Sequence, residues 1–506
     1  MSNESNIFSA FDFKKDRNWI DWFYRFDIAK FETLLRTKNE SFWQKAGERR
    51  ALELFHAAAE RVPAYKDFLK KHDIRHMEIK TILDFRGVPL TDKENYIQAY
   101  PLKKRCWDGS LARQAVIPAS SGTSGEPKFW PRGGFQEFEA GVIHELIYKN
   151  IFHINKHKTL ALIGFPMGVY VSGVATVLPT WLVANKKYDL TLMSIGNNKS
   201  EMLRAVRNLY KDYSQILLIG HPFFIKDVIE AGKNEGVLWS KMKLGLMFCS
   251  EGFSEGWRRY ILKQADMSFG RNMAVSTYGS SEMLLMGHET PLSVFVRTAL
   301  EKNTTIAQKM FGDIAMPDLF QYNPLFRYIE SVHDDLVFTS ASGIPLVRFN
   351  LRDSGKVIPF VSIKKIISKT NADDWELPFV ALRGRSDQTI VFYAANIYPE
   401  HVKAGLDDVK FYGKLTGKFV MRKDYLKNMD EFLEINIELT KETKTRSSLA
   451  AAIQKEVVKK LRKINMEYLD ASSRFGEKLI PRIILWPYQH EKHFRPGLKP
   501  KYIAKQ

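Results

Sequence analysis

Two patterns of hydrophobic and polar positions, short apolar runs and stretches with helical spacing, alternate along this chain of 506 residues. Between about residue 115 and residue 385, short apolar runs predict buried strands, and stretches of helical spacing separate them. We expect strands at residues 159–163, 215–219 and 244–248, and helices at residues 201–213 and 223–235. This alternation predicts a layered α/β domain in which helices cover a sheet.

The pattern restarts on a smaller scale after Arg385. Residues 434–439 alternate like a strand, residues 447–469 have apolar positions every four residues, and residues 478–486 are a further strand candidate. We therefore predict a compact C-terminal α+β domain of about 120 residues with a flexible joint near residues 384–387. The predicted division is an N-terminal extension (residues 1–40), a large domain (residues 41–385) and a small C-terminal domain (residues 386–506).

The first 40 residues are rich in aromatic side chains. A helix lying on a membrane is one interpretation, but acidic and basic residues such as Asp21 and Arg25 are mixed here, which favours packing onto the main body. A helix is expected from residue 41 to residue 62, before Pro63. No uncharged run of about 18 apolar residues occurs, so we expect no membrane-spanning segment.

The composition limits which binding partners and which cellular compartment we expect. The two cysteines, Cys106 and Cys249, lie far apart, which argues for a reducing cytoplasm and against a disulfide framework or a zinc cluster. The formal net charge of +19 suits anions such as ATP and coenzyme A, although the lysines are scattered as on a solvated surface. No zinc-finger, RRM or basic-zipper pattern accompanies the charge, so no nucleic-acid partner is expected.

Candidate chemistry begins at Ser120-Ser121-Gly122-Thr123-Ser124-Gly125-Glu126-Pro127-Lys128. Glycine allows positive φ, so successive N–H groups can line one concavity and, with the hydroxyl groups, bind phosphate oxygens. Lys128 adds a mobile positive charge, and the spacing is not that of a Walker loop. Taken alone, the stretch could also be an ordinary Ser/Gly surface turn.

Three later segments carry carboxylates beside glycines and arginines. Tyr278-Gly279-Ser280-Ser281-Glu282 follows an apolar run, so Glu282 is expected at the rim of the sheet, where a carboxylate can hold Mg²⁺ against phosphates; an exposed turn is the alternative. Asp353 is expected in a turn after a strand, where it can accept bonds from both ribose hydroxyls; Arg348 and Arg352 could equally form surface ion pairs. Two adjacent strands and a turn would fill the gap from Asp353 to Asp387.

Together these segments resemble the ANL superfamily of adenylate-forming enzymes, in particular the phenylacetate–CoA ligase-like and capsule-biosynthesis-type adenylating proteins. Further stretches resemble that group in the same order along the chain. They are Val62-Pro63-Ala64-Tyr65, Val88-Pro89-Leu90-Thr91-Asp92-Lys93-Glu94, Gly168-Val169-Tyr170-Val171-Ser172-Gly173 and Ser250-Glu251-Gly252-Phe253-Ser254-Glu255.

The resemblance implies a role for each matched residue. Glu282 would bind Mg²⁺ and Asp353 the ribose. The small C-terminal domain would be a mobile lid domain, and Asp387 would be its pivot. Lys499 would be the catalytic lysine, with Lys501 as its rival. The nucleotide-binding residues would be Ser120, Ser121, Gly122, Thr123, Ser124, Gly125, Lys128, Glu251, Tyr278, Gly279, Ser281, Asp353 and Arg385. Candidates for the acid pocket are Tyr170, Gly173, His221 and Ser276, although aromatic residues at such places are more often simple core, and His221 is equally a structural turn residue.

The implied activity is ATP-dependent conversion of an aromatic or other small carboxylic acid to acyl-AMP, followed by transfer to CoA in the cytoplasm. Two departures weaken the thiol step: Ala394 stands where the family has glycine, and the motif around Lys499 is loose. An amide ligase or a carrier-protein-loading enzyme therefore stays open. A non-catalytic scaffold of the same fold is disfavoured by the intact set of Lys128, Glu282, Asp353 and Lys499, and the oligomeric state, a homodimer included, stays open.

Overall fold

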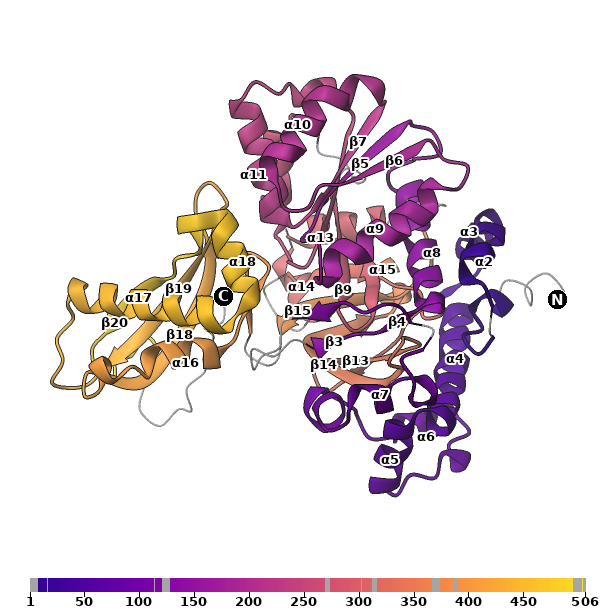
Figure 1. The fold of residues 1–506 in the computed structure, drawn as a ribbon, viewed down its shortest axis with the longest axis horizontal. Helices are drawn as coiled ribbons and strands as arrows, with labels where there is room; N and C mark the ends of the chain where they lie inside the picture. The colour runs from indigo at the N-terminus through magenta and orange to yellow at the C-terminus, as the bar shows by residue number, and fades with distance from the viewer. Residues whose placement is uncertain are drawn as a thin grey trace. The chain divides into compact units, whose positions relative to one another are not determined.

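The computed structural model describes residues 8–15, 17–112, 114–120, 128–268, 274–301, 303–311, 316–365, 374–385, 389–494 and 503. Contacts divide the chain into two compact units, one of residues 1–120 and 129–384 and one of residues 121–128 and 385–506. The first unit is a sheet with helices packed against it, which confirms the predicted α/β fold class (Figure 1).

The first unit is built on one sheet, in which eleven strands are described. In spatial order they are β12 (Tyr328–Val332), β13 (Asp335–Ser340), β14 (Leu346–Ile358), β15 (Phe379–Arg385), β11 (Asp318–Gln321), β10 (Leu284–His288), β9 (Ala274–Ser280), β8 (Leu244–Cys249), β7 (Gln215–Gly220), β5 (Thr159–Gly164) and β6 (Leu190–Ser194). The last five run parallel to one another, and β10 pairs antiparallel with β9 and with β11.

The predicted strands at residues 159–163, 215–219 and 244–248 are confirmed as β5, β7 and β8, each one residue longer than expected. Every residue of β5 and β7 is buried, which explains their continuous apolar runs: parallel strands are covered on both faces. The predicted helices between them are α10 (Lys199–Leu209) and α11 (Pro222–Asn234), which Figure 1 shows beside these strands.

Except for the exposed Tyr24, the N-terminal aromatic residues in the described ranges lie in the core of the first unit or pack against it. Phe11 and Phe26 both pack on Phe138, with ring centroids 5.5 and 5.6 Å apart. Phe23 and Phe31 are completely buried, so the side chains lie inside the protein, as the mixed charge of this region predicted. Phe11 ends a 3₁₀ turn (Ser9–Phe11), and Phe26 directly follows α2 (Trp19–Arg25). The other helices of this region are α3 (Ile28–Thr37), which carries Phe31, α4 (Glu40–Arg61) and α8 (Gly134–Asn150), which carries Phe138. None of the helices in the described ranges is both long enough and apolar enough to cross a membrane.

Shorter elements complete the first unit. Its other helices are α5 (Pro63–Lys71), α6 (Ile82–Arg86), α7 (Leu102–Arg105), α9 (Val171–Ala184), α12 (Glu255–Gln264), α13 (Pro291–Glu301), α14 (Thr304–Phe311) and α15 (Phe360–Lys364). Two small sheets pair β1 (Gln114–Val116) with β4 (Arg132–Gly133) and β2 (Ala119–Ser120) with β3 (Lys128–Phe129).

The second unit has the predicted α+β composition, with two corrections. Its sheet orders β18 (Leu415–Tyr425), β19 (Glu431–Leu439) and β20 (Arg482–Trp486), and its helices are α16 (Pro399–Leu406), α17 (Ser447–Ile464) and α18 (Met466–Phe475). The single helix predicted over residues 447–469 is wrong because Asn465 interrupts it: its side chain accepts a bond from Tyr468 N (2.9 Å) and donates to Asn396 O (2.8 Å). The strand predicted from residue 478 begins only at Arg482, since Gly476–Leu479 forms a turn of 3₁₀ helix.

Candidate active site

Tyr278 and Asp353 meet although 75 residues separate them in the chain. The Tyr278 hydroxyl, near the carboxyl end of β9, donates a hydrogen bond to the Asp353 carboxylate on β14. The Tyr278 ring stacks on Phe320 of β11, with centroids 5.4 Å apart and planes 20° apart. Both Tyr278 and Asp353 are buried, so the bond between them forms in a poorly solvated place and is a strong one.

Asp353 lies within a strand, so the turn predicted for it is wrong. Strand β14 runs through it from Leu346 to Ile358. The register with β13 slips here: Val337 pairs with Asn350, but Leu336 pairs with Asp353. The extra residues form a bulge in which Arg352 has φ of +65°, and such bulges re-aim the neighbouring side chain. The bulge, rather than a turn, presents the Asp353 carboxylate.

Glu282 is paired with a lysine to which the sequence had assigned no role. Lys93 Nζ lies 3.4 Å from Glu282 Oε1, and the Glu282 side chain is only 5% exposed. Thr91 ties the Lys93 segment to β14: its N–H donates to Arg348 O (3.1 Å), and its carbonyl accepts from Asn350 N (2.7 Å). The motif match at residues 88–94 was the sequence signal for Lys93, but only the fold shows which carboxylate it meets.

A buried arginine fixes the backbone next to Glu282. Arg327 Nη2 donates to Met283 O (2.7 Å), and Arg327 Nη1 pairs with Glu139 of α8 (2.7 Å). Arg50 holds the other oxygen of Glu139 at 2.5 Å. Glu139 is fully buried between the two guanidinium groups, so paired charges shielded from water hold this part of the site.

The arginines flanking Asp353 differ from each other. Arg348 is buried and pairs with Glu330 through two contacts of 3.1 Å, so the surface ion pair considered for it is wrong. Arg352 is partly exposed and lies 3.1 Å from Asp92 and 3.5 Å from Glu94. The motif at residues 88–94 therefore provides both the lysine that pairs with Glu282 and the two carboxylates that pair with Arg352.

The proposed phosphate loop is described only at its two ends. Ser120 lies in β2 and Lys128 in β3, and Trp130 Nε1 donates to Ser120 Oγ (2.9 Å). The remaining candidates in this loop, Ser121, Gly122, Thr123, Ser124 and Gly125, lie outside the described residues, as do Asp387, Lys499 and Lys501. Arg385 is described, as the last residue of β15.

The acid-pocket candidates fall into two groups. His221 follows β7, and its buried ring meets Phe165 edge-on with centroids 5.0 Å apart. Tyr170 precedes α9, where Gly173 approaches Pro166 so closely that a Cβ would lie 2.2 Å from the Pro166 oxygen. Ser276 differs from these residues: it lies within β9, and its N–H donates to Glu289 Oε2 (2.7 Å).

The remaining nucleotide candidates lie beside these strands. Glu251 follows β8 and is buried, next to Ser250 with φ of +78°. Gly279 pairs with Leu285 across the turn from β9 to β10, and Ser281 lies in that turn. The carboxyl ends of β8 and β9 thus bring Glu251 and Tyr278 to the same edge of the sheet.

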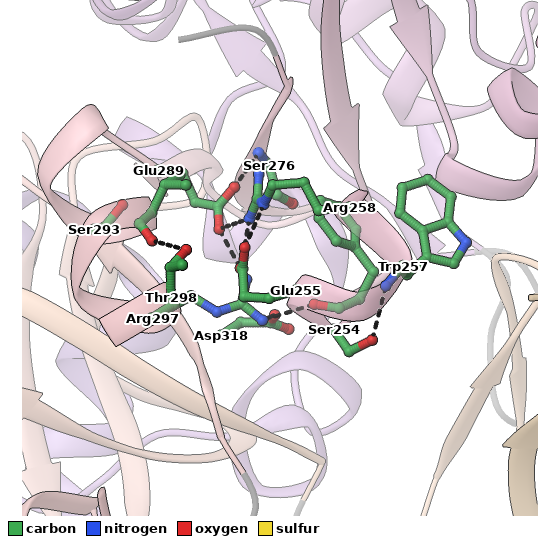
Figure 2. Close-up of polar contacts among 12 residues, drawn as sticks. Ser254, Glu255, Trp257, Arg258, Ser276, Glu289, Ser293, Arg297, Thr298 and Asp318 are labelled. Carbon is green, nitrogen blue, oxygen red and sulfur yellow. Dashed lines mark hydrogen bonds and ion pairs between the residues drawn. The ribbon is translucent and has the colours of Figure 1, made fainter. Parts of the chain in front are cut away.

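A buried charge network joins α12, α13, β9 and β11 (Figure 2). Arg258 pairs with Glu255 (2.8 Å) and Glu289 (2.6 Å), and Arg297 pairs with Glu289 (2.8 Å) and Asp318 (3.2 Å). Burial raises the pKa of Asp318 to about 6, although Arg297 opposes the shift. Burial would raise the pKa of Glu289 as well, but the charges of Arg258 and Arg297 outweigh burial and hold this pKa below its usual range.

Replacing Asp318 with Asn is expected to change how stability depends on pH. Since the folded-state pKa of Asp318 is raised, protonation stabilises the folded protein below about pH 4, and this contribution is lost as the pH rises to about 6. The difference in unfolding free energy between wild type and D318N should change by at most about 3 kcal/mol across this window. Urea unfolding from pH 4 to pH 8 measures it, and parallel stability curves would contradict the shift.

The second unit shows an unusual turn at Ala394. Phe392 of β16 (Ile390–Phe392) pairs with Ala395 of β17 (Ala395–Ile397), which leaves Tyr393 and Ala394 as a two-residue turn. Their φ values are +48° and +63°, so two residues with side chains adopt the conformation that favours glycine. Glu431 stabilises the turn by accepting a bond from Tyr393 N (3.1 Å).

Neither models of known protein families nor curated proteins match this sequence. Solved structures do match. A 2-hydroxyisobutyryl-CoA ligase in complex with 2-HIB-AMP and CoA, in the thioesterification state, superposes with a TM-score of 0.65 and 15% identity, over 97% of this chain and 95% of the other. The same ligase in the postadenylation state, in complex with 2-HIB-AMP, superposes with a TM-score of 0.55 and 16% sequence identity, over 94% of this chain and 92% of the other. The chain therefore has the two-domain fold of these adenylate-forming enzymes.

Proposed function

We propose that this protein is an AMP-forming ligase that activates an aromatic or other small carboxylic acid as acyl-AMP and passes the acyl group to CoA. The observation that carries the proposal is the hydrogen bond from Tyr278 to Asp353, with Glu282 buried four residues after Tyr278. Residues from two separate motifs meet in one unit, as a single nucleotide site requires. The superposed ligase, which binds 2-HIB-AMP and CoA, supports the same conclusion.

The proposed roles follow from charge. The acid and ATP are both anions, so an attack of the carboxylate oxygen on the α-phosphorus needs positive groups nearby. Lys128 would neutralise the β- and γ-phosphates, and Lys499 the charge that develops as pyrophosphate leaves. In the second step a thiolate sulfur attacks the acyl carbon, and the bond to AMP breaks. Movement of the lid domain about Asp387 would withdraw Lys499 between the two steps.

Glu282 suits a magnesium ion that is bound mainly by substrate. Among the described residues no three carboxylate, histidine or cysteine side chains gather to hold a metal. Mg²⁺ is commonly held by one or two carboxylates together with phosphate oxygens, and the buried Glu282 already faces a cation, Lys93. When bound there, Mg²⁺ would neutralise phosphate charge. Lys93 would hold the Glu282 carboxylate in position.

Replacing Asp353 with Asn tests the ribose assignment. Loss of charge-assisted bonds to the ribose hydroxyls costs about 1.5–3 kcal/mol, so the KM for ATP should rise on the order of 10- to 100-fold. Wild type should discriminate against 2′-deoxy-ATP, and D353N should discriminate much less. Equal discrimination by both proteins would remove Asp353 from the ribose site, whereas Tyr278→Phe, which removes only the neighbouring hydroxyl, should have the smaller effect.

The Ala394 turn favours a second candidate, a ligase whose acyl acceptor is an amine. Its side chain occupies a position with φ of +63°, where the resembled family has glycine bordering the pantetheine passage. An added methyl group there would narrow a passage for CoA but would not hinder a small amine. An acceptor screen with AMP release as its readout separates the candidates: thioester formation supports the ligase to CoA, and amide formation without thioester supports the second candidate.

Pyrophosphate exchange with a library of aromatic, fatty and polyketide-like acids tests the activity itself. We expect label to pass from pyrophosphate into ATP only when an accepted acid is present. If no acid supports exchange and the protein binds no ATP, the chain is instead a scaffold that has only the fold.

A further inference from the structure

The network of Figure 2 occupies the place where a neighbouring strand ends. Strand β10 pairs with β9 only as far as His288, opposite Thr277. Beyond that point, β9 bonds to residues of the network: Ser276 N donates to Glu289 Oε2 (2.7 Å), and Ala274 O accepts from Arg258. The backbone N–H of Glu289 also donates to Ser276 O (2.8 Å), so this edge of β9 is bonded partly by the main chain of Glu289 and partly by the charged side chains of Glu289 and Arg258.

The same network holds the segment formed by residues 250–254. Arg297 Nη2 donates to Phe253 O (2.7 Å) and lies 3.2 Å from Asp318 Oδ1. Gly252 packs so closely on Asp318 that a Cβ would lie 1.8 Å from Asp318 Oδ2. Glu251, within this segment, is buried as well. Arg297 thus links the backbone of residues 250–254 to Glu289, and through Glu289 to β9.

We propose that Glu289 and Arg297 are positioning residues of the nucleotide site. They set the separation between residues 250–254, which carry Glu251, and β9, which carries Tyr278; these two segments would flank the adenine. The inference rests on the proposed function. Glu289 and Arg297 are almost completely buried, so the charges that they neutralise cannot turn to water when a partner is removed. The loss of either residue therefore shifts the two segments relative to each other.

The test is nucleotide binding by Glu289→Gln, which keeps the shape of the side chain but removes its charge. We expect the Kd of a non-hydrolysable ATP analogue, measured by calorimetry, to rise at least about 10-fold. The KM for the acid should rise less, because the Glu289 side chain bonds to the backbone N–H of the acid-pocket candidate Ser276 and not to its side chain. The matched control is Glu301→Gln. It breaks the exposed pair Arg259–Glu301 (2.7 Å), which joins the same two helices, α12 and α13, and it should leave both constants unchanged.

Each outcome has a defined meaning. Wild type that binds no ATP analogue would refute the proposed function. Wild-type affinity in a folded Glu289→Gln protein, or equal losses for ATP and acid, would refute the positioning role alone. If Glu289→Gln does not fold, Arg297→Lys decides, because lysine keeps the charge but cannot contact Phe253, Glu289 and Asp318 together. Selective loss of ATP affinity in that variant supports the inference, and unchanged affinity overturns it.

Discussion

Glu282→Gln is expected to reduce acid-dependent pyrophosphate exchange by about 10²–10³-fold, the range seen when one group that stabilises transition-state charge is lost. The amide keeps the size of the side chain but cannot neutralise a cation. Lys93 would then lose its partner at 3.4 Å, and a magnesium ion would lose its protein ligand. Exchange rates measured over a range of Mg²⁺ concentrations should show that the variant needs far more metal for half-maximal activity.

Glu78→Gln is the matched control for this variant. The Glu78 side chain is 59% exposed, and its carboxylate forms a surface ion pair with Arg75 at 3.1 Å. Removing the charge of Glu78 should therefore change the rate of pyrophosphate exchange by less than a factor of two. The assignment of Glu282 would fail if Glu282→Gln retained both the wild-type rate and the wild-type requirement for Mg²⁺.

Lys499→Ala is expected to abolish adenylation selectively. A lysine that neutralises charge on the leaving pyrophosphate acts only in the first step, so exchange should fall by about 10²-fold or more. Transfer from chemically supplied acyl-AMP to the acceptor should stay within a few-fold of wild type, because the lysine is withdrawn in that step. Comparing the two half-reactions separates a catalytic role from general damage.

Lys501→Ala serves as the comparison within the same motif. If Lys501 rather than Lys499 is the catalytic residue, Lys501→Ala should lose pyrophosphate exchange and Lys499→Ala should keep it. If both variants keep wild-type exchange, neither lysine of this motif takes part in adenylation.

Prediction from sequence was most reliable where the signal was local. The buried strands β5, β7 and β8 were predicted to within one residue, because their apolar runs are covered on both faces by helices. Prediction was poorer where one side chain decides the outcome. Asn465 ends α17 by capping the next helix, and the bulge at Arg352 keeps Asp353 inside a strand. Neither the Asn465 cap nor the Arg352 bulge produces a hydrophobic periodicity in the sequence, so neither could be predicted from the pattern of apolar residues.

The amino-acid sequence by itself determined the α/β class, the order of the motifs and the residue types of the proposed site. These depend on periodicity and on chemistry that adjacent residues carry. Only the tertiary structure decided which distant groups meet: Lys93 with Glu282, Tyr278 with Asp353, and Arg297 with both Glu289 and the backbone of Phe253. Such pairings arise from strand order and from a bulge in the register, so no local pattern in the chain encodes them.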